Sequence, residues 1–298
     1  MENSFLFRIP LEALRSMDVF ARVIDAYLPA DVPGGVRTLA DLPEDLPNRA
    51  AFLDALREAE AEFQRRMRAE VREFGVDLDP NGLRYQWGNP ETDEAVVSLI
   101  EQSEAPIQKG QIVFYGPSNI AQWYSLETDM LPYKAYNHGI GGCIDEDMIR
   151  YAPRLLYPYE PAVVFFQTGS NDIASGIPLE TILENKKRMY GLFLENMSQA
   201  QLVVCSGLPL PGRTQFWDAT VETNALLKKM CDETPRLHFM DATDAMLTDA
   251  GPERLRTSDG RYFNPAYYRQ DRIHLNKKGH DVWTALMKAK LAELLEKR

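Results

Sequence analysis

The chain has 298 residues, of which 45% are hydrophobic and 26% charged, so it is long enough for one large or two modest globular domains. Its net charge of −11 lies mostly in the first 110 residues, with 21 of the 44 acidic and 12 of the 33 basic residues, which argues against nucleic acid or an anionic membrane surface as a partner. The three cysteines include no C-x-x-C pair, which argues against disulfides and structural zinc and makes a reducing cytoplasm the expected location. Charges spread through the first thirty positions argue against a signal peptide and a membrane span.

Residues 1–106 are predicted to form a mostly helical N-terminal extension. Between positions 48 and 74, apolar residues recur three or four apart and charged residues fill the other side, which predicts an amphipathic helix with Asn48 as its N-cap and Gly75 as its stop. The other expected elements here are two weaker helices and a turn-rich loop, at residues 11–28, 91–103 and 77–92. The apolar stripe must be buried. Packing within the same chain is the default expectation, and a homo-oligomer through these helices is the alternative.

Residues 107–298 are predicted to form a second domain around a parallel sheet. Five short apolar runs indicate strands, at 112–115, 134–137, 162–167, 202–206 and 236–240. Helical patterns fill the gaps, near 118–130, 144–156, 178–198, 215–232 and 276–296. Apolar strands that alternate with helices are typical of a parallel sheet covered on both faces. Ligands bind such sheets at the carboxyl ends of the strands, so chemistry is expected after Tyr115, Asn137 and Gln167 and in the loop before the last helix.

All four of these places carry residues suited to catalysis. Ser118 opens a predicted helix directly after the first strand, and Gly116 before it permits a tight turn. The second strand is followed by the glycine-rich stretch NHGIGGC, and the third by Asn171, whose side-chain amide is a hydrogen-bond donor. In the stretch DRIHLNKKGH before the last helix, Asp271 lies three residues before His274. Together they supply a nucleophile, a base with the carboxylate that orients it, and donors for a developing oxyanion.

Each piece alone has an ordinary structural explanation. A serine at a helix start is usually a cap, and glycines or an Asn-Asp pair after a strand usually make a turn. A histidine three residues after an aspartate can be a local hydrogen-bonded pair. Their order along the chain, each at the tip of a predicted strand or before the last helix, favours a serine hydrolase. No G-x-S-x-G motif is present, so the nucleophile elbow of the alpha/beta-hydrolases is not indicated.

At these positions the chain resembles the SGNH, or GDSL-like, hydrolases, a family named for Ser, Gly, Asn and His in four sequence blocks. The stretch IVFYGPSNIAQW, residues 112–123, resembles the first block of its acetylhydrolase-like branch. The other blocks resemble NHGIGG, GSND and DRIHLN, at residues 137–142, 169–172 and 271–276. The resemblance covers roughly residues 110–298 and does not extend to the front third.

The resemblance implies a flavodoxin-like three-layer α/β/α sandwich with a central, mostly parallel five-stranded sheet. It also implies a serine esterase that needs neither metal nor other cofactor. The implied site residues are a triad and three oxyanion donors, namely Ser118, Asp271 and His274, and the backbone amides of Ser118 and Gly142 with the side chain of Asn171.

Two positions depart from the family pattern. Pro117 and Cys143 stand where the family often has Asp. Both of those acids tie loops together rather than react, so the departures bear on loop geometry more than on chemistry. They leave open a catalytically idle relative, a module that binds a glycan or a protein partner.

The expected substrate is a small-molecule ester with a short acyl group, such as an acetylated carbohydrate. A phospholipid acetylhydrolase or lysophospholipase activity is the alternative. His138, Trp123 and Tyr267 are candidates for contact with the substrate, although ordinary packing is an alternative for Trp123 and solvent exposure for His138. No grouping of His, Cys and carboxylates has metal-ligand spacing, so no metal is expected.

Four further residues that could carry chemistry are expected to be structural. Ser170 is interpreted as a turn former and Cys143 as a space-filling thiol. His238 is interpreted as a satisfied residue of the last strand. His280 falls on the last helix with no acid partner suggested by the sequence.

Overall fold

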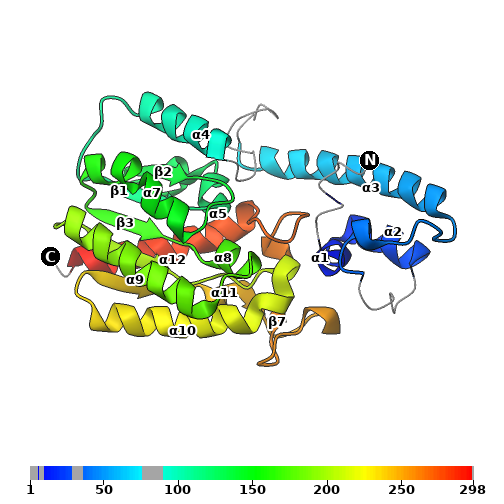
Figure 1. Ribbon diagram of the computed structural model, residues 1–298. Coiled ribbons are helices and arrows are strands. Elements are labelled where there is room, and N and C mark those ends of the chain that lie inside the picture. The colour runs from blue at the N-terminus through cyan, green and yellow to red at the C-terminus, as the bar shows by residue number, and fades with distance from the viewer. Residues whose placement is uncertain (1–5, 7–9, 29–35, 76–89, 297–298) are drawn as a thin grey trace.

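A five-stranded parallel sheet lies at the centre of the computed structural model, which describes residues 6, 10–28, 36–75 and 90–296 (Figure 1). Its strands are β1 (Ile112–Gly116), β2 (Ala135–Gly139), β3 (Val163–Phe166), β4 (Gln201–Cys205) and β5 (Leu237–Met240). The spatial order β2-β1-β3-β4-β5 is that of the flavodoxin-like sandwich, so the predicted fold is confirmed. Each predicted strand is present, with ends that shift by one or two residues.

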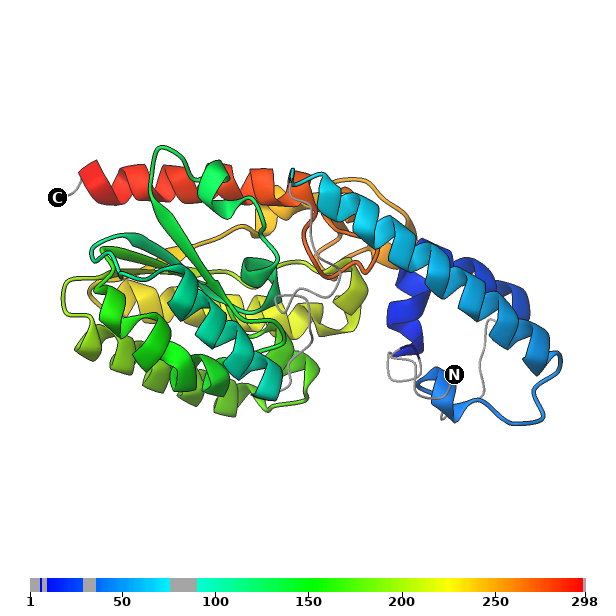
Figure 2. The same cartoon turned by 90° about the horizontal axis from the view of Figure 1, so that it is seen from above.

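Helices cover both faces of the sheet because successive side chains of each strand point to opposite sides. Tyr115 packs in the cluster beneath one face and its neighbour Phe114 in the cluster beneath the other. The first face is covered by α4 (Pro90–Ser103), α7 (Asp145–Leu155), α9 (Leu179–Asn196) and α10 (Trp217–Glu233). The second is covered by α5 (Ser118–Ala121), α6 (Leu126–Asp129) and α12 (Lys277–Glu296). Figure 2 shows the sheet between these two layers.

The helix predicted at 118–130 is wrong as a single element, because the chain turns between α5 and α6. Side-chain hydrogen bonds compete with the helix there. The indole N–H of Trp123 and the hydroxyl of Ser125 both donate to Asp129, at 2.8 and 2.6 Å. Asn137 donates to the carbonyls of Ile120 and Trp123, which a continuous helix would use for its own ladder. Among the short elements that the pattern missed are the helix α8 (Ser170–Ala174) and the antiparallel pair of β6 (Leu247–Thr248) with β7 (Tyr262–Phe263).

The N-terminal helices form a lobe beside one end of the sandwich (Figures 1 and 2). The lobe contains α1 (Leu11–Ser16), α2 (Asp18–Tyr27) and α3 (Arg49–Arg72), so the helix predicted at 48–74 is confirmed and the one at 11–28 is broken at Met17. The apolar stripe of α3 packs within the chain, against Phe20 and its neighbours in α2. The homo-oligomer alternative stays a prediction.

Helix α4 belongs with the sandwich in its packing, although it precedes the first strand. Val97 and Ile100 are fully buried in the same cluster as α7 and the first face of the sheet. The division of the chain at 106/107 stays a prediction. The loop predicted at 77–92 falls mostly on residues 76–89, which lie outside the described residues.

Candidate active site

Ser118 lies at the carboxyl edge of the sheet because two glycines let its helix come close to the strands. A Cβ on Gly139, at the end of β2, would lie 2.1 Å from the backbone nitrogen of Ala121 in α5. A Cβ on Gly116, the last residue of β1, would lie 2.5 Å from the carbonyl oxygen of Gln167. A side chain at Gly139 would push α5 away from the sheet, and one at Gly116 would meet the backbone after β3 as well as Ile120 of α5. The side chain of Ser118 is partly exposed at this edge.

Asp271 and His274 form a buried hydrogen-bonded pair in the loop before α12, called here the acid–base loop (residues 269–275). Nδ1 of His274 lies 2.6 Å from Oδ2 of Asp271, and the other carboxylate oxygen accepts the backbone N–H groups of Ile273 and His274, both at 2.9 Å. Burial by itself raises the pKa of Asp271, but the charge of His274 and its hydrogen bonds, with the charge of Arg269, lower it to about 2. Asp271 is therefore a fixed negative charge behind the imidazole at neutral pH.

Two residues that the sequence analysis missed tie the acid–base loop to α5. Asn119 donates to the carbonyl of Ile273 at 3.4 Å and accepts the N–H of Leu275 at 3.0 Å, so it holds both neighbours of His274. The buried Arg269 donates to the carbonyl of Leu275 and to Oε1 of Gln122, at 3.2 and 2.8 Å. The only sequence signal was the position of Asn119 directly after the candidate nucleophile.

Two of the three candidate oxyanion donors, Gly142 and Asn171, follow β2 and β3. Gly142 has a φ of +76°, a backbone conformation that favours glycine. Asn171, in α8, donates from Nδ2 to the carbonyl of Cys143 at 3.0 Å, which links the two donor loops. Oδ1 of Asn171 accepts from both Nη atoms of Arg213, each at 3.1 Å. Burial lowers the pKa of Arg213, and the negative charge of Asp271 acts in the opposite direction.

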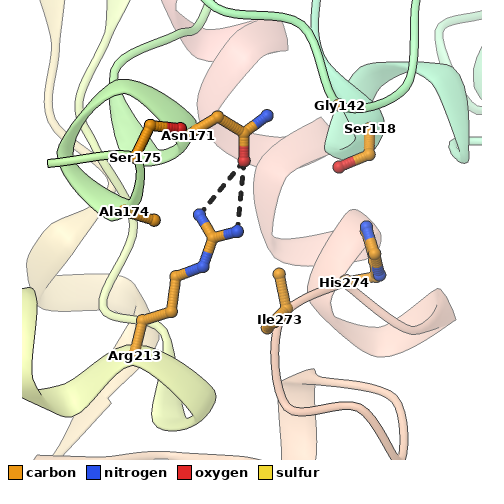
Figure 3. A pocket seen from close by; sticks show the side chains of 8 residues that line it. All are labelled: Ser118, Gly142, Asn171, Ala174, Ser175, Arg213, Ile273 and His274. Atoms are coloured by element: carbon orange, nitrogen blue, oxygen red, sulfur yellow. Dashed lines mark hydrogen bonds between the residues drawn. The ribbon is translucent and has the colours of Figure 1, made fainter. Parts of the chain in front are cut away.

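One cavity of about 260 Å³ is lined by the candidate residues Ser118, Gly142, Asn171, Arg213 and His274, together with Ala174, Ser175 and Ile273. In Figure 3 the oxygen of Ser118 and the imidazole of His274 lie on one side of it, and Asn171 and Arg213 lie opposite. The structure thus brings Ser118, Gly142, Asn171 and His274 together, with Asp271 behind the imidazole. Arg213 is the charged lining residue that the sequence analysis did not single out, because it lies outside the four sequence blocks.

The three candidate substrate-contact residues do not line this cavity. Trp123 is fully buried and packs against Phe114 and His280, which is the packing role given as its alternative. His138 is also fully buried, with its ring nitrogens 2.5 Å from the carbonyl of Leu155 and 2.8 Å from Glu104, because β2 turns it toward the first helical layer and not toward solvent. Tyr267 is partly buried against the cluster of the second face.

The residues expected to be structural have structural partners. Cys143 is buried, and burial raises the pKa of its thiol far above the ordinary value. His280 is fully buried against Trp123, and burial lowers its pKa to about 3, so its ring is neutral. His238 pairs with Gln201 at 2.7 Å, and the hydroxyl of Ser170 accepts from Arg213 at 2.6 Å.

The described part of the chain has neither a metal-ligand cluster nor a membrane-spanning helix. No group of three or more His, Cys, Asp or Glu side chains there could hold a metal ion. No described helix has the length and apolar character needed to cross a membrane.

Residues 110–282 match the model of the GDSL-like Lipase/Acylhydrolase family. No curated protein matches the chain in sequence. Among solved structures, the fold is similar to that of a protein described as a platelet activating factor from Streptococcus pneumonia, with a TM-score of 0.57 and 17% identity over 67% of this chain and 92% of that one. It is also similar to a protein described as an acylhydrolase from Bacteroides fragilis, with a TM-score of 0.55 and 22% identity over 66% and 96% of the two chains. A third similar structure is that of a GDSL-like lipase from Bacteroides thetaiotaomicron, with a TM-score of 0.51 and 18% identity over 66% of this chain and 98% of that one.

Proposed function

Because this chain belongs to the GDSL-like lipase/acylhydrolase family, we propose that it is a serine esterase that hydrolyses short acyl esters through Ser118, His274 and Asp271. The observation that supports this most is the single cavity lined by Ser118, His274 and Asn171, with a buried carboxylate behind the imidazole. Nucleophile, base with its orienting acid, and oxyanion donors are the parts that acyl transfer requires.

In the proposed mechanism, Oγ of Ser118 attacks the ester carbonyl while Nε2 of His274 takes the hydroxyl proton. Asp271 holds Nδ1–H and stabilises the imidazolium that forms. The oxyanion accepts from the backbone amides of Ser118 and Gly142 and from Nδ2 of Asn171. The imidazolium then protonates the leaving alcohol, and the C–O bond breaks to leave an acyl-enzyme. Water then attacks the acyl-enzyme and passes a proton to His274. His274 returns this proton to Oγ of Ser118 as the acyl–oxygen bond breaks, and the acid is released.

The small cavity favours a short acyl group. Its volume of about 260 Å³ lies below the 300–1,000 Å³ or so of pockets that enclose drug-sized ligands. We propose acetyl-like esters, such as those of acetylated carbohydrates, as the substrates. Rates on 4-nitrophenyl esters from acetate to laurate, and on lysophosphatidylcholine, test this. A fall in kcat/KM with chain length is expected, and a preference for the long or phospholipid esters would contradict it.

Replacing the nucleophile tests the enzyme itself. Ser118→Ala is expected to lower kcat for 4-nitrophenyl acetate by at least about 10³-fold, because no other group replaces the attacking oxygen. A fluorophosphonate probe should label the wild type at Ser118, located by peptide mass spectrometry, and should not label the variant.

Ser258→Ala, which removes an exposed hydroxyl bonded to Asp218, is the matched control and should keep wild-type activity and labelling. Wild-type activity in folded Ser118→Ala protein would refute the assignment. Folded wild type that neither hydrolyses esters nor takes the probe would favour the non-catalytic binding module.

A further inference from the structure

Arg213 lies in the cavity but belongs to none of the sequence blocks of the family. It is part of the 3₁₀ helix η5 (Pro211–Phe216), which follows β4, and its φ of −139° and ψ of 37° interrupt that helix. The four hydrogen bonds of its guanidinium in the described structure go to two consecutive residues. Nη1 donates to the carbonyl of Ser170 at 2.8 Å, to its hydroxyl at 2.6 Å and to Oδ1 of Asn171 at 3.1 Å, and Nη2 donates to the same Oδ1 at 3.1 Å.

Together with the carbonyl of Cys143, these contacts decide which way the carboxamide of Asn171 faces. An asparagine amide can turn over about its last torsion at little intrinsic cost, which would exchange its oxygen and nitrogen. A guanidinium has only donors, so in the turned amide an NH₂ group would face N–H groups and the two hydrogen bonds from Arg213 would be lost. The turned oxygen would also face the carbonyl of Cys143, so a third hydrogen bond would be lost. With Arg213 in place, Oδ1 faces the guanidinium and Nδ2 faces the carbonyl of Cys143 and the cavity (Figure 3).

The same contact polarises the amide. One Nδ2 hydrogen is used by the carbonyl of Cys143, which leaves the second for a ligand in the cavity. A cation that donates to the amide oxygen withdraws electron density from the nitrogen and strengthens its remaining N–H as a donor. The gain is largest where negative charge develops, as on a tetrahedral oxyanion.

The backbone of η5 is itself anchored to the acid–base loop. The N–H of Gly212 donates to the carbonyl of Arg272 at 2.8 Å. A Cβ on Gly212 would lie 3.0 Å from the carbonyl oxygen of Asp271, so a larger residue would force the two segments apart. Arg213 therefore reaches from a segment held by the acid–base loop to the donor on the other side of the cavity.

We propose that Arg213 is a positioning residue for ester hydrolysis, which fixes and polarises the Asn171 carboxamide as an oxyanion donor. The proposal rests on the proposed esterase function. It predicts that Arg213 acts on kcat and not on substrate affinity, and that it acts only through Asn171.

A double-mutant cycle tests both points, with 4-nitrophenyl acetate as substrate. Arg213→Met is expected to lower kcat roughly 10–100-fold and to change KM by less than about twofold, since the donor acts in the transition state. Asn171→Ala is expected to lower kcat by about 10²–10³-fold. The double variant should be no slower than Asn171→Ala alone. Arg213→Lys, which keeps a cation with a single point of contact, should recover part of the loss.

Arg236→Met is the matched control, because Arg236 is also part-buried and donates to three carbonyls, of Leu194, Met197 and Ala200. It should lower the melting temperature and leave kcat unchanged. The side-chain amide signals of Asn171 in a ¹⁵N-labelled protein give a readout without turnover, and they should shift in Arg213→Met.

The proposal would be overturned if Arg213→Met lowered kcat by the same factor in the presence and in the absence of the Asn171 side chain. A change in KM alone, or unchanged amide signals, would also overturn it. If wild-type protein hydrolyses no ester, the proposed function fails and the amide signals alone decide whether Arg213 orients Asn171. If the wild type is active and the losses are additive, only the role of Arg213 fails.

Discussion

A single carboxylate, Asp271, organises the acid–base loop. It accepts hydrogen bonds from the imidazole of His274 and from two backbone N–H groups. These bonds compensate its charge, although the residue is buried and only 5% exposed. Its lowered pKa is a statement about stability as well as chemistry. The pKa of Asp271 is about 2 in the folded protein and near 3.8 in the unfolded chain, so its ionised form stabilises the fold above about pH 3.8. This contribution to the free energy of unfolding is lost as the pH falls toward about 2.

Asp271→Asn separates these two effects. We expect kcat to fall on the order of 10⁴-fold at neutral pH with little change in KM, because the amide favours the wrong imidazole tautomer. The free energy of unfolding of the variant at pH 7 should also be lower by about 2 kcal/mol, which is the free energy that corresponds to the lowered pKa of Asp271. Denaturant unfolding at several pH values measures this difference. It should shrink between pH 4 and pH 2, and a difference that stayed constant would contradict the assignment of charge.

At the scale of elements, the N-terminal helices brace the acid–base loop from outside the sandwich. Glu70 in α3 accepts both the backbone N–H of Gln270, at 3.1 Å, and its side-chain amide, at 3.0 Å. Arg272 donates to Asp18 in α2 at 2.8 Å. Asp271 therefore lies between two residues that the lobe holds. Burial raises the pKa of Glu70, and the hydrogen bonds from Gln270 oppose that rise.

Glu70→Ala tests this support without deleting the lobe. It removes two hydrogen bonds to the residue before Asp271, so we expect kcat for 4-nitrophenyl acetate to fall on the order of 10-fold through misplacement of the imidazole. Glu73→Ala, at an exposed position one turn farther along the same segment, is the control and should have no effect. Unchanged kcat in folded Glu70→Ala protein would mean that the lobe has no part in placing the acid–base loop.

Across the molecule, a buried ionic cluster joins the segments after β2 and β3, which carry the candidate donors Gly142 and Asn171. Lys186 in α9 donates to Asp145 at 3.0 Å and to Thr168 at 2.8 Å, and Asp172 accepts the backbone N–H of Asp145 at 3.1 Å. Lys186, Asp145 and Asp172 are all fully buried. Burial and the charge of Asp145 raise the pKa of Asp172 to about 6, so the cost of ionising Asp172 in the folded protein lowers the free energy of unfolding as the pH rises from about 3.8 to about 6, and it is complete above that value.

Lys186→Met removes the ammonium from this cluster. The two carboxylates then lack a counter-charge, and we expect the variant to lose about 3–5 kcal/mol of stability at pH 8. The loss should be smaller at pH 5, which lies below the raised pKa of Asp172, so that this carboxyl group is protonated there. Lys187→Met, at the exposed neighbouring position, should change stability little at either pH. Urea unfolding at both pH values measures the difference, and equal losses would show that the cluster does not carry this charge.

Much of the architecture could be predicted because it follows from local patterns. Apolar runs such as the one that became β3 allow little besides a strand buried on both faces. The parallel topology then places residues after β1, β2 and β3 at one edge, which is why Ser118, Gly142 and Asn171 could be expected to meet. Asp271 and His274 are three residues apart, so their pairing is also local.

Local sequence patterns were therefore enough to predict the sandwich, the edge of the sheet at which chemistry is expected, and the candidate triad. The tertiary structure alone decided the partners of those residues: Arg213 for Asn171, 42 positions away, and Asn119 for Leu275, 156 positions away. It also decided that Trp123 and His138 turn into packed layers and away from the cavity. The physical reason is that periodicity reports which face a residue takes on its own element, whereas hydrogen-bond partners depend on how separate elements pack.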